Sequence, residues 1–237
     1  MGRAIFISLS LLVSAFFTAT TFLIGTSNNT IIDIIDRLPL IFSPIRLTYV
    51  LLIMIFIGLG YYCIQAFKTH VSLIQTLLFI INSVLQVVAV YYWYYELTMY
   101  ALLALIMLNV GLFVLYLTHS MQANQLKIRL PIAAWYSWTM FFTLITINYN
   151  MIAYEWAGFN LSDNLWAVII LTFGAAYSLH LRYHYYDRLA PLLFSAGYLG
   201  IIIANGVSQL FVSASTLFLI GVMIVGYFFI KKKRPLA

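Results

Sequence analysis

The residues with the clearest chemical potential are two histidines, His180 and His184, which are four positions apart. If one helix runs through both, they share a face, with Asp187 close behind. Imidazole nitrogens can bind a metal ion or exchange a proton near neutral pH. A metal site needs further convergent ligands, which the neighbouring sequence does not supply. The two histidines are therefore weak candidates for a metal or acid–base site, and an interfacial basic patch is the simpler interpretation.

Neutral polar side chains form two stripes at helical spacing. The first stripe has intervals of 7 and 4 and consists of Gln75, Asn82 and Gln86. The second has intervals of 4, 4, 3 and 4 and consists of Trp135, Thr139, Thr143, Thr146 and Asn150. In lipid such groups face another helix or a cavity, and we expect the two stripes to meet. They either hold helices together by hydrogen bonds or line a cavity for a flat, amphipathic ligand between aromatic walls.

The elements that carry these residues are expected to be membrane-spanning helices. Of the 237 residues, 64% are hydrophobic and 8% are charged, which is too few charges for a water-facing surface. A helix needs about 20 apolar residues to cross the hydrocarbon core. Eight stretches approach this length, at residues 4–25, 45–67, 72–93, 97–118, 130–153, 164–180, 189–205 and 209–230. The expected fold class is all-α, a polytopic bundle of about eight transmembrane helices, or seven if the last two form a broken pair.

The charged residues separate onto two sides of this arrangement. Ten of the twelve bases fall on one side: Arg3, Lys68, Lys127, Arg129, Arg182, Arg188, Lys231, Lys232, Lys233 and Arg234. The other side carries Arg37 and Arg46 with five of the six acids: Asp33, Asp36, Glu96, Glu155 and Asp163. Because bases accumulate in cytoplasmic loops, we expect a cell-membrane protein with both termini in the cytoplasm. The basic C-terminal run is typical of an anchor to the anionic lipid bilayer, and no nucleic-acid partner is expected.

Several function classes lack their usual residues. The expected spans place no ionisable group at the bilayer centre, which argues against a retinal pump or a proton-coupled antiporter. The sequence also lacks a nucleophile motif, a phosphate-binding glycine loop and an HExxH pattern. An enzyme is therefore the less favoured interpretation. Its candidate residues would be His180, His184 and Asp187, acting at the cytoplasmic interface on a lipid or isoprenoid.

Four stretches resemble the TspO family of tryptophan-rich sensory or translocator proteins. They are the loop Leu38-Pro39-Leu40-Ile41-Phe42-Ser43-Pro44-Ile45 with the following Gly58, Gly60 and Tyr61, then Asn82, then Trp93-Tyr94-Tyr95-Glu96-Leu97, and then Pro131-Ile132-Ala133-Ala134-Trp135. The resemblance implies a five-helix core over residues 1–155. Residues 156–237 resemble the three-helix extension of the longer bacterial members.

The resemblance also implies a pocket under the first loop that binds porphyrins, haem-like tetrapyrroles or sterol-like lipids. By resemblance, the residues that line or shape it are Pro44, Asn82, Trp93, Trp135 and Thr143; by spacing alone, Gln86, Thr139 and Thr146 join them. The chain departs from the family pattern where family aromatic residues fall on Leu52, Phe56 and Leu85 and a family asparagine falls on Thr143.

Three functions are open at this point. The first is a membrane sensor or carrier that holds a small, planar, hydrophobic ligand, with porphyrin or haem as a possible ligand and no certain cofactor. The second is a non-catalytic subunit of a larger membrane transporter or enzyme complex, which fits the short loops and the lack of a soluble domain. The third is the intramembrane lipid-modifying enzyme. The resemblance adds a homodimer as a possible assembly.

Overall fold

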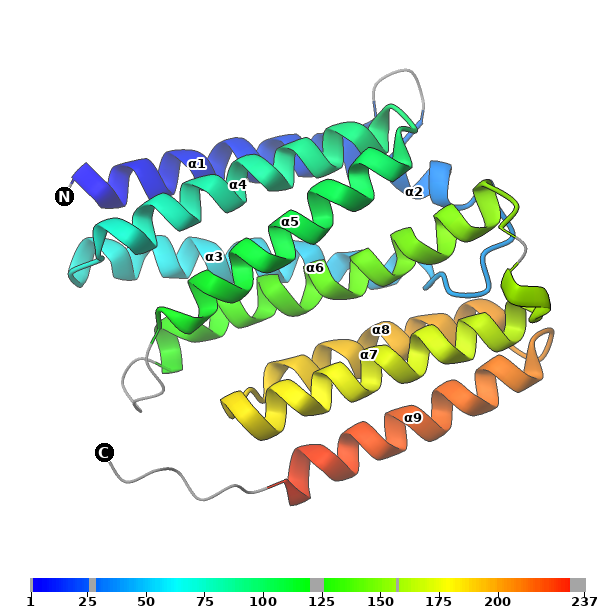
Figure 1. Cartoon of the computed structure of the whole chain (residues 1–237). Helices are drawn as coiled ribbons and strands as arrows, with labels where there is room; N and C mark the ends of the chain where they lie inside the picture. The colour runs from blue at the N-terminus through cyan, green and yellow to red at the C-terminus, as the bar shows by residue number, and fades with distance from the viewer. Residues whose placement is uncertain (1, 26–28, 120–125, 157, 231–237) are drawn as a thin grey trace.

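The computed structural model of the chain describes residues 2–25, 29–119, 126–156 and 158–230. Its elements are all helices (Figure 1). They are α1 (Gly2–Ala19), η1 (Thr20–Ile24), α2 (Ile31–Ile35), η2 (Arg46–Tyr49), α3 (Val50–Lys68), α4 (Leu73–Tyr94), α5 (Thr98–Leu117), α6 (Leu126–Ala153), η3 (Gly158–Asn160), α7 (Asp163–Tyr185), α8 (Leu189–Asn205) and α9 (Leu210–Phe229). The predicted all-α membrane bundle is confirmed.

The eight predicted spans correspond to the eight long helices within the described residues. Seven of these helices are long and apolar enough to cross a membrane. The remaining one, α8, has 17 residues and reaches about 25 Å at 1.5 Å per residue, slightly short of the hydrocarbon core. Helices α8 and α9 are separated by a turn at Gly206, whose φ of 52° suits glycine.

Local side-chain chemistry explains where several helices begin. At α4, the Ser72 hydroxyl accepts a hydrogen bond from the backbone N–H of Gln75, whose side chain accepts one from the Ser72 N–H. This capping box satisfies N–H groups that have no partner within the helix. Thr30 and Asp33 form the same arrangement at α2. These caps fix where α2 and α4 begin.

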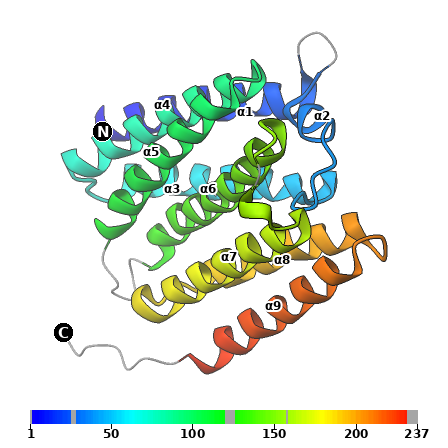
Figure 2. The ribbon, with the colours of Figure 1, turned by 45° about the vertical axis from the view of Figure 1, so that its right-hand side comes forward.

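Helix α6 is the centre of the molecule. In its most apolar stretch 78% of residues are buried, compared with 33–39% in the other six spans. It packs against α3 and α5 on one side and against α7 and α8 on the other. Figures 1 and 2 show the resulting arrangement, with α1, α3, α4 and α5 on one side of α6 and α7, α8 and α9 on the other. Residues on α6 can therefore contact most of the bundle.

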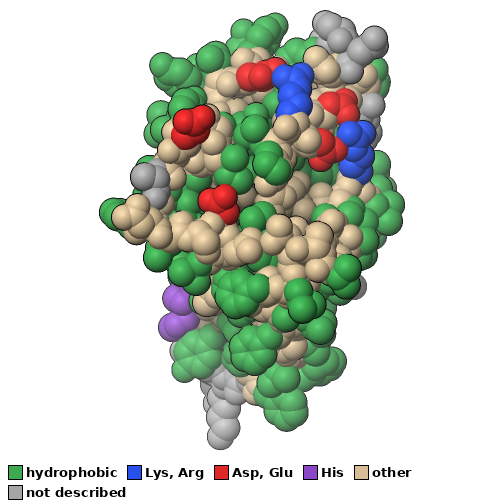
Figure 3. Space-filling view, turned by 90° about the vertical axis from the view of Figure 1, so that its right-hand side faces the viewer, with side chains coloured by type: hydrophobic (Ala, Val, Ile, Leu, Met, Phe, Trp, Pro, Cys, Tyr) green, Lys and Arg blue, Asp and Glu red, His purple; other side chains and the backbone are tan. Residues whose placement is uncertain are grey.

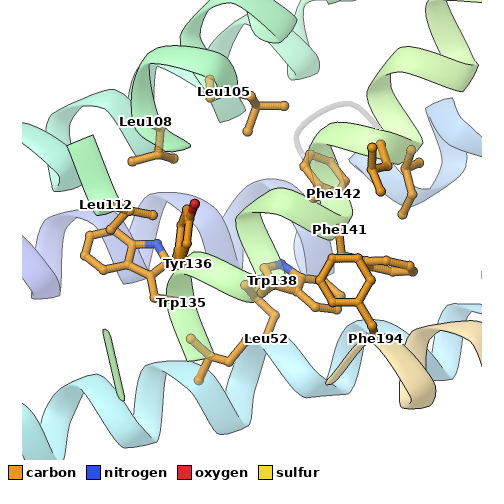
Figure 4. Close-up of a cluster of buried hydrophobic side chains, with 14 of the residues drawn as sticks. Leu52, Leu105, Leu108, Leu112, Trp135, Tyr136, Trp138, Phe141, Phe142 and Phe194 are labelled. Atoms are coloured by element: carbon orange, nitrogen blue, oxygen red, sulfur yellow. The ribbon is translucent and has the colours of Figure 1, made fainter. Parts of the chain in front are cut away.

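The core along α6 is aromatic. Trp135, Tyr136, Trp138, Phe141 and Phe142 are all buried and follow one another along this helix (Figure 4). Leucines of α5, Leu52 of α3 and Phe194 of α8 surround them in the same view. In lipid, where there is little hydrophobic drive between helices, such close packing is a main source of association.

The two ends of the bundle differ in charge. At the end with α2, Arg37 pairs with Glu96 at 2.6 Å, and Arg46 pairs with Asp33 at 2.9 Å and Asp36 at 2.7 Å. Figure 3 looks onto this end, where acidic side chains gather with the arginines. The first residues of α1 and the last residues of α9 lie at the opposite end (Figure 1). This matches the predicted segregation of the charges.

Candidate functional site

The two predicted polar stripes meet at one point, where Gln86 of α4 bonds to Trp135 of α6. The indole N–H of Trp135 donates to Gln86 Oε1 over 3.0 Å, and both residues are buried. Two turns further along α4, the indole N–H of Trp93 donates to Thr146 Oγ1, also over 3.0 Å. Because an indole N–H can only donate, each tryptophan needs an acceptor on the facing helix. These bonds align α4 with α6.

Helix α5 contributes the third side of this polar region. Asn109 Nδ2 donates to Thr143 Oγ1 over 2.7 Å and to the Leu105 carbonyl over 2.8 Å. Closer to the α4–α5 turn, the Thr98 hydroxyl donates to Asn150 Oδ1 over 2.6 Å. Three helices are therefore joined by side-chain hydrogen bonds.

The threonines of α6 act as acceptors toward their neighbours. The hydroxyls of Thr139, Thr143 and Thr146 donate to the carbonyls of the residues four positions earlier, over 2.7–2.9 Å. Each hydroxyl has one proton, which this bond uses, so its oxygen is left with lone pairs. Thr143 and Thr146 accept from Asn109 and Trp93, whereas Thr139 faces a cavity.

This cavity lies beside the Gln86–Trp135 bond. Its lining residues are Phe22, Leu52, Gln86, Ala89, Val90, Leu105, Trp138, Thr139 and Phe142. Its volume of about 10 Å³ is room for about one water molecule. Phe22 comes from η1, which follows α1, and Leu52 comes from the start of α3, so the cavity lies toward the first-loop end. Gln86 and Thr139 are the two predicted site residues that line it.

Asn82 lies outside this cavity. Its side chain is fully buried, and neither polar atom of its amide has a hydrogen-bond partner within the described residues. A methyl group added to Gly111 of α5 would overlap Asn82 Oδ1, so the glycine makes room for the amide. Buried amides without partners are rare and costly, which marks Asn82 as an unusual position in the α4–α5 contact.

Pro44 lies against α8 and is separate from the α4–α6 residues. A methyl group added to Gly200 of α8 would come within 2.9 Å of Pro44 Cβ. The Ile45 backbone N–H donates to the Gly200 carbonyl over 3.1 Å, and Asn205 Nδ2 donates to the Ile41 carbonyl over 2.8 Å. The first loop is therefore attached to α8, in the part of the chain predicted as the extension.

The histidine pair is on the surface. His180 and His184 have ring centroids 4.3 Å apart, as their spacing predicted, and both are exposed. Asp187 is buried instead of joining them. Within the described residues, no cluster of three or more His, Cys, Asp or Glu side chains could hold a metal ion.

The cavity residues that the sequence analysis missed are mostly apolar. Phe22, Leu105, Trp138 and Phe142 come from three different parts of the chain. In a sequence that is 64% hydrophobic, nothing distinguishes them from lipid-facing neighbours. The π-helical geometry of Thr20–Ile24, which often occurs at functional sites, has no sequence signal either.

Comparison with known protein families gives a match over most of the chain. Residues 4–229 match the sequence model of a family described as TSPO-like protein. No curated protein and no solved structure matches the chain. The matched range runs from within α1 to the end of α9, so the similarity extends through both the predicted core and the predicted extension. The chain therefore belongs to the TSPO-like protein family.

Proposed function

We propose that this membrane protein of the TspO type is a sensor or carrier that binds a small, planar, hydrophobic ligand in the cavity between α4, α5 and α6. The observation that carries the proposal is the lining, which places Gln86 and Thr139 among aromatic and aliphatic side chains. Ligand pockets commonly combine apolar walls with a few oriented polar groups.

The orientation of the Gln86 amide supports a ligand that carries a hydroxyl group. Its oxygen accepts from the Trp135 indole, so its NH₂ group is the end left for other partners. Thr139 offers lone pairs, because its proton is used by the Trp135 carbonyl. A ligand hydroxyl could both accept from Gln86 and donate to Thr139. Among the described residues, the lining has no ionisable side chain, which favours a neutral, sterol-like end over the carboxylates of a porphyrin or haem.

The size of the cavity requires movement on binding. A ligand larger than one water must displace lining side chains, and Phe22 is the best placed to move. It belongs to η1, next to the first loop, and its ring contacts Tyr49 and Phe142 at centroid distances of 5.9 and 5.7 Å. We propose that outward movement of η1 opens the cavity toward the first-loop end.

The test is binding in lipid nanodiscs, with a fluorescent sterol and protoporphyrin IX as probes. Gln86→Leu should weaken sterol binding about tenfold, which corresponds to the loss of one hydrogen bond of about 1.4 kcal/mol. Gln75→Leu is the matched control. Gln75 is on the same helix, but it lies in the first turn of α4, away from the cavity, and bonds to the Thr118 carbonyl. Equal, non-saturating signals in all three proteins would reject the site.

That negative result would favour the second function, a non-catalytic subunit of a membrane complex. The observation behind it is that side-chain hydrogen bonds join α4 and α5 to α6. They are Trp93 to Thr146, Trp135 to Gln86 and Asn109 to Thr143, as expected if the polar stripes only hold the bundle together. The exposed apolar faces of the other spans would then contact a protein partner or a second copy. For either function we propose that the base-rich end, with both termini, faces the cytoplasm.

A further inference from the structure

A buried carboxyl group lies at the junction of α7 and α8. Asp187 is only 6% exposed. Its Oδ1 accepts hydrogen bonds from the backbone N–H groups of Leu189 and Ala190, over 2.8 and 3.3 Å, at the start of α8. Its Oδ2 is buried and has no hydrogen-bond partner within the described residues. A buried, ionised oxygen without a partner is costly, so this atom needs an explanation.

The guanidinium of Arg129, which acts on the Asp187 carboxyl electrostatically, does not supply a hydrogen-bond partner for Oδ2. Arg129 of α6 is 3% exposed, and its guanidinium carbon lies 3.8 Å from the centroid of the Tyr116 ring of α5. The same guanidinium donates to the Tyr185 carbonyl over 3.3 Å. Within the described residues, Arg129 and Asp187 form no ion pair, although Arg129 is close enough to affect the carboxyl electrostatically. Arg129 Nε is also buried without a partner.

Other charged or titratable groups face Asp187 from the elements around it. The Tyr116 hydroxyl of α5 acts on the carboxyl as a hydrogen-bonding group, and Tyr136 approaches from α6. Arg182 of α7 contributes an attraction, but its guanidinium donates to the Tyr227 carbonyl of α9. Two phenols and two guanidinium groups therefore surround one carboxyl group, and both cations are bound to other partners.

Burial raises the pKa of Asp187 above its ordinary value of 3.8. The two backbone N–H groups, Arg129 and the Tyr116 hydroxyl oppose this effect without reversing it. With a proton on Oδ2 the carboxyl group would be neutral, and its O–H could donate a hydrogen bond to a nearby oxygen. Burial thus favours the neutral acid, while Oδ1 accepts the two N–H groups at the start of α8.

We propose that Asp187 is an exchangeable proton-binding site that controls the contact of the α7–α8 connection with α5 and α6. With the proton bound, Asp187 caps α8 and Arg129 stays on the Tyr116 ring. When the proton leaves, the uncompensated carboxylate attracts Arg129 away from Tyr116 and the Tyr185 carbonyl. Loss of the proton therefore breaks the contacts of Arg129 with Tyr116 of α5 and with the Tyr185 carbonyl at the end of α7.

The direct test is infrared spectroscopy of the full chain in a detergent without ester groups. As the pH rises above the ordinary titration range of aspartate, the wild type should lose a protonated-carboxyl C=O band. Asp187→Asn should lack this change, whereas Asp163→Asn, which alters an exposed aspartate, should retain it. If no band titrates above the ordinary range, or if it persists in Asp187→Asn, the proposal is wrong.

Thermal unfolding provides a second, independent measurement. A carboxyl whose pKa is raised by folding stabilises the fold below about pH 4, and this contribution is lost as pH rises through the folded pKa. The wild type should therefore lose thermal stability with rising pH. Asp187→Asn keeps an oxygen that can cap α8 and cannot ionise, so its curve should be flatter. Identical pH dependence in the two proteins would overturn the proposed control of the junction.

Discussion

Replacing Trp135 with phenylalanine removes the indole N–H that donates to Gln86 Oε1 over 3.0 Å, while an aromatic ring stays in the core. Trp135 is 2% exposed and Gln86 is 8% exposed, so water cannot easily replace the bond. We expect a loss of about 2 kcal/mol in the free energy of unfolding. About half should come from the hydrogen bond and the rest from the space left by the smaller ring.

A double-mutant cycle separates these two contributions. Trp135→Phe, Gln86→Leu and the double variant are unfolded in detergent, with helix content followed by circular dichroism. Because the double variant leaves neither partner unpaired, it should be less destabilised than the sum of the single changes by about 1 kcal/mol. Polar contacts between membrane helices rarely exceed about 1.7 kcal/mol, which bounds the expected coupling.

The control cycle combines Gln86→Leu with Trp93→Phe. Trp93 is on the same helix but donates to Thr146, so these two changes should add. Simple additivity in the Trp135 cycle as well would refute the assignment of a stabilising bond between α4 and α6.

Two further predictions concern glycines of α8. Gly197→Ala places a methyl group 2.5 Å from the Phe141 ring and should destabilise the α6–α8 contact by about 1–3 kcal/mol in the same unfolding assay. Gly200→Ala would overlap Thr48 Oγ1 and should increase amide hydrogen exchange in the first loop, measured by mass spectrometry. Gly60→Ala, which meets no atom within 4 Å, is the control for both, and equal effects at all three positions would contradict the packing.

Sequence periodicity predicted the features that depend on a single helix. The apolar stretches located the long helices, and helical spacing placed Gln86 and Trp135 on faces that meet. Each of these follows from 3.6 residues per turn and from the high cost of unpaired polar groups in lipid. Gln75 and Asn82, the other members of the first stripe, lie against Thr118 and Gly111 instead.

The remaining features depend on how separate helices pack. Pro44 was predicted at the ligand site but lies against Gly200 of α8, which no local pattern indicates. Asp187 was grouped with the histidines by proximity in sequence, whereas the turn at Tyr186, with a φ of 57°, is followed by its burial near Arg129. Phe22 is one of 18 phenylalanines, and its place in the cavity lining comes from the assembled bundle alone.

The most direct test of the proposed ligand site is photo-crosslinking with a light-activated sterol in nanodiscs, with the labelled residues mapped by mass spectrometry. We predict labels on Phe22, Leu52 and Leu105, removed by excess unlabelled sterol and reduced in Gln86→Leu. Labels confined to lipid-facing residues such as Leu9 and Leu103, each 59% exposed, and unaffected by competitor would contradict a ligand site inside the bundle.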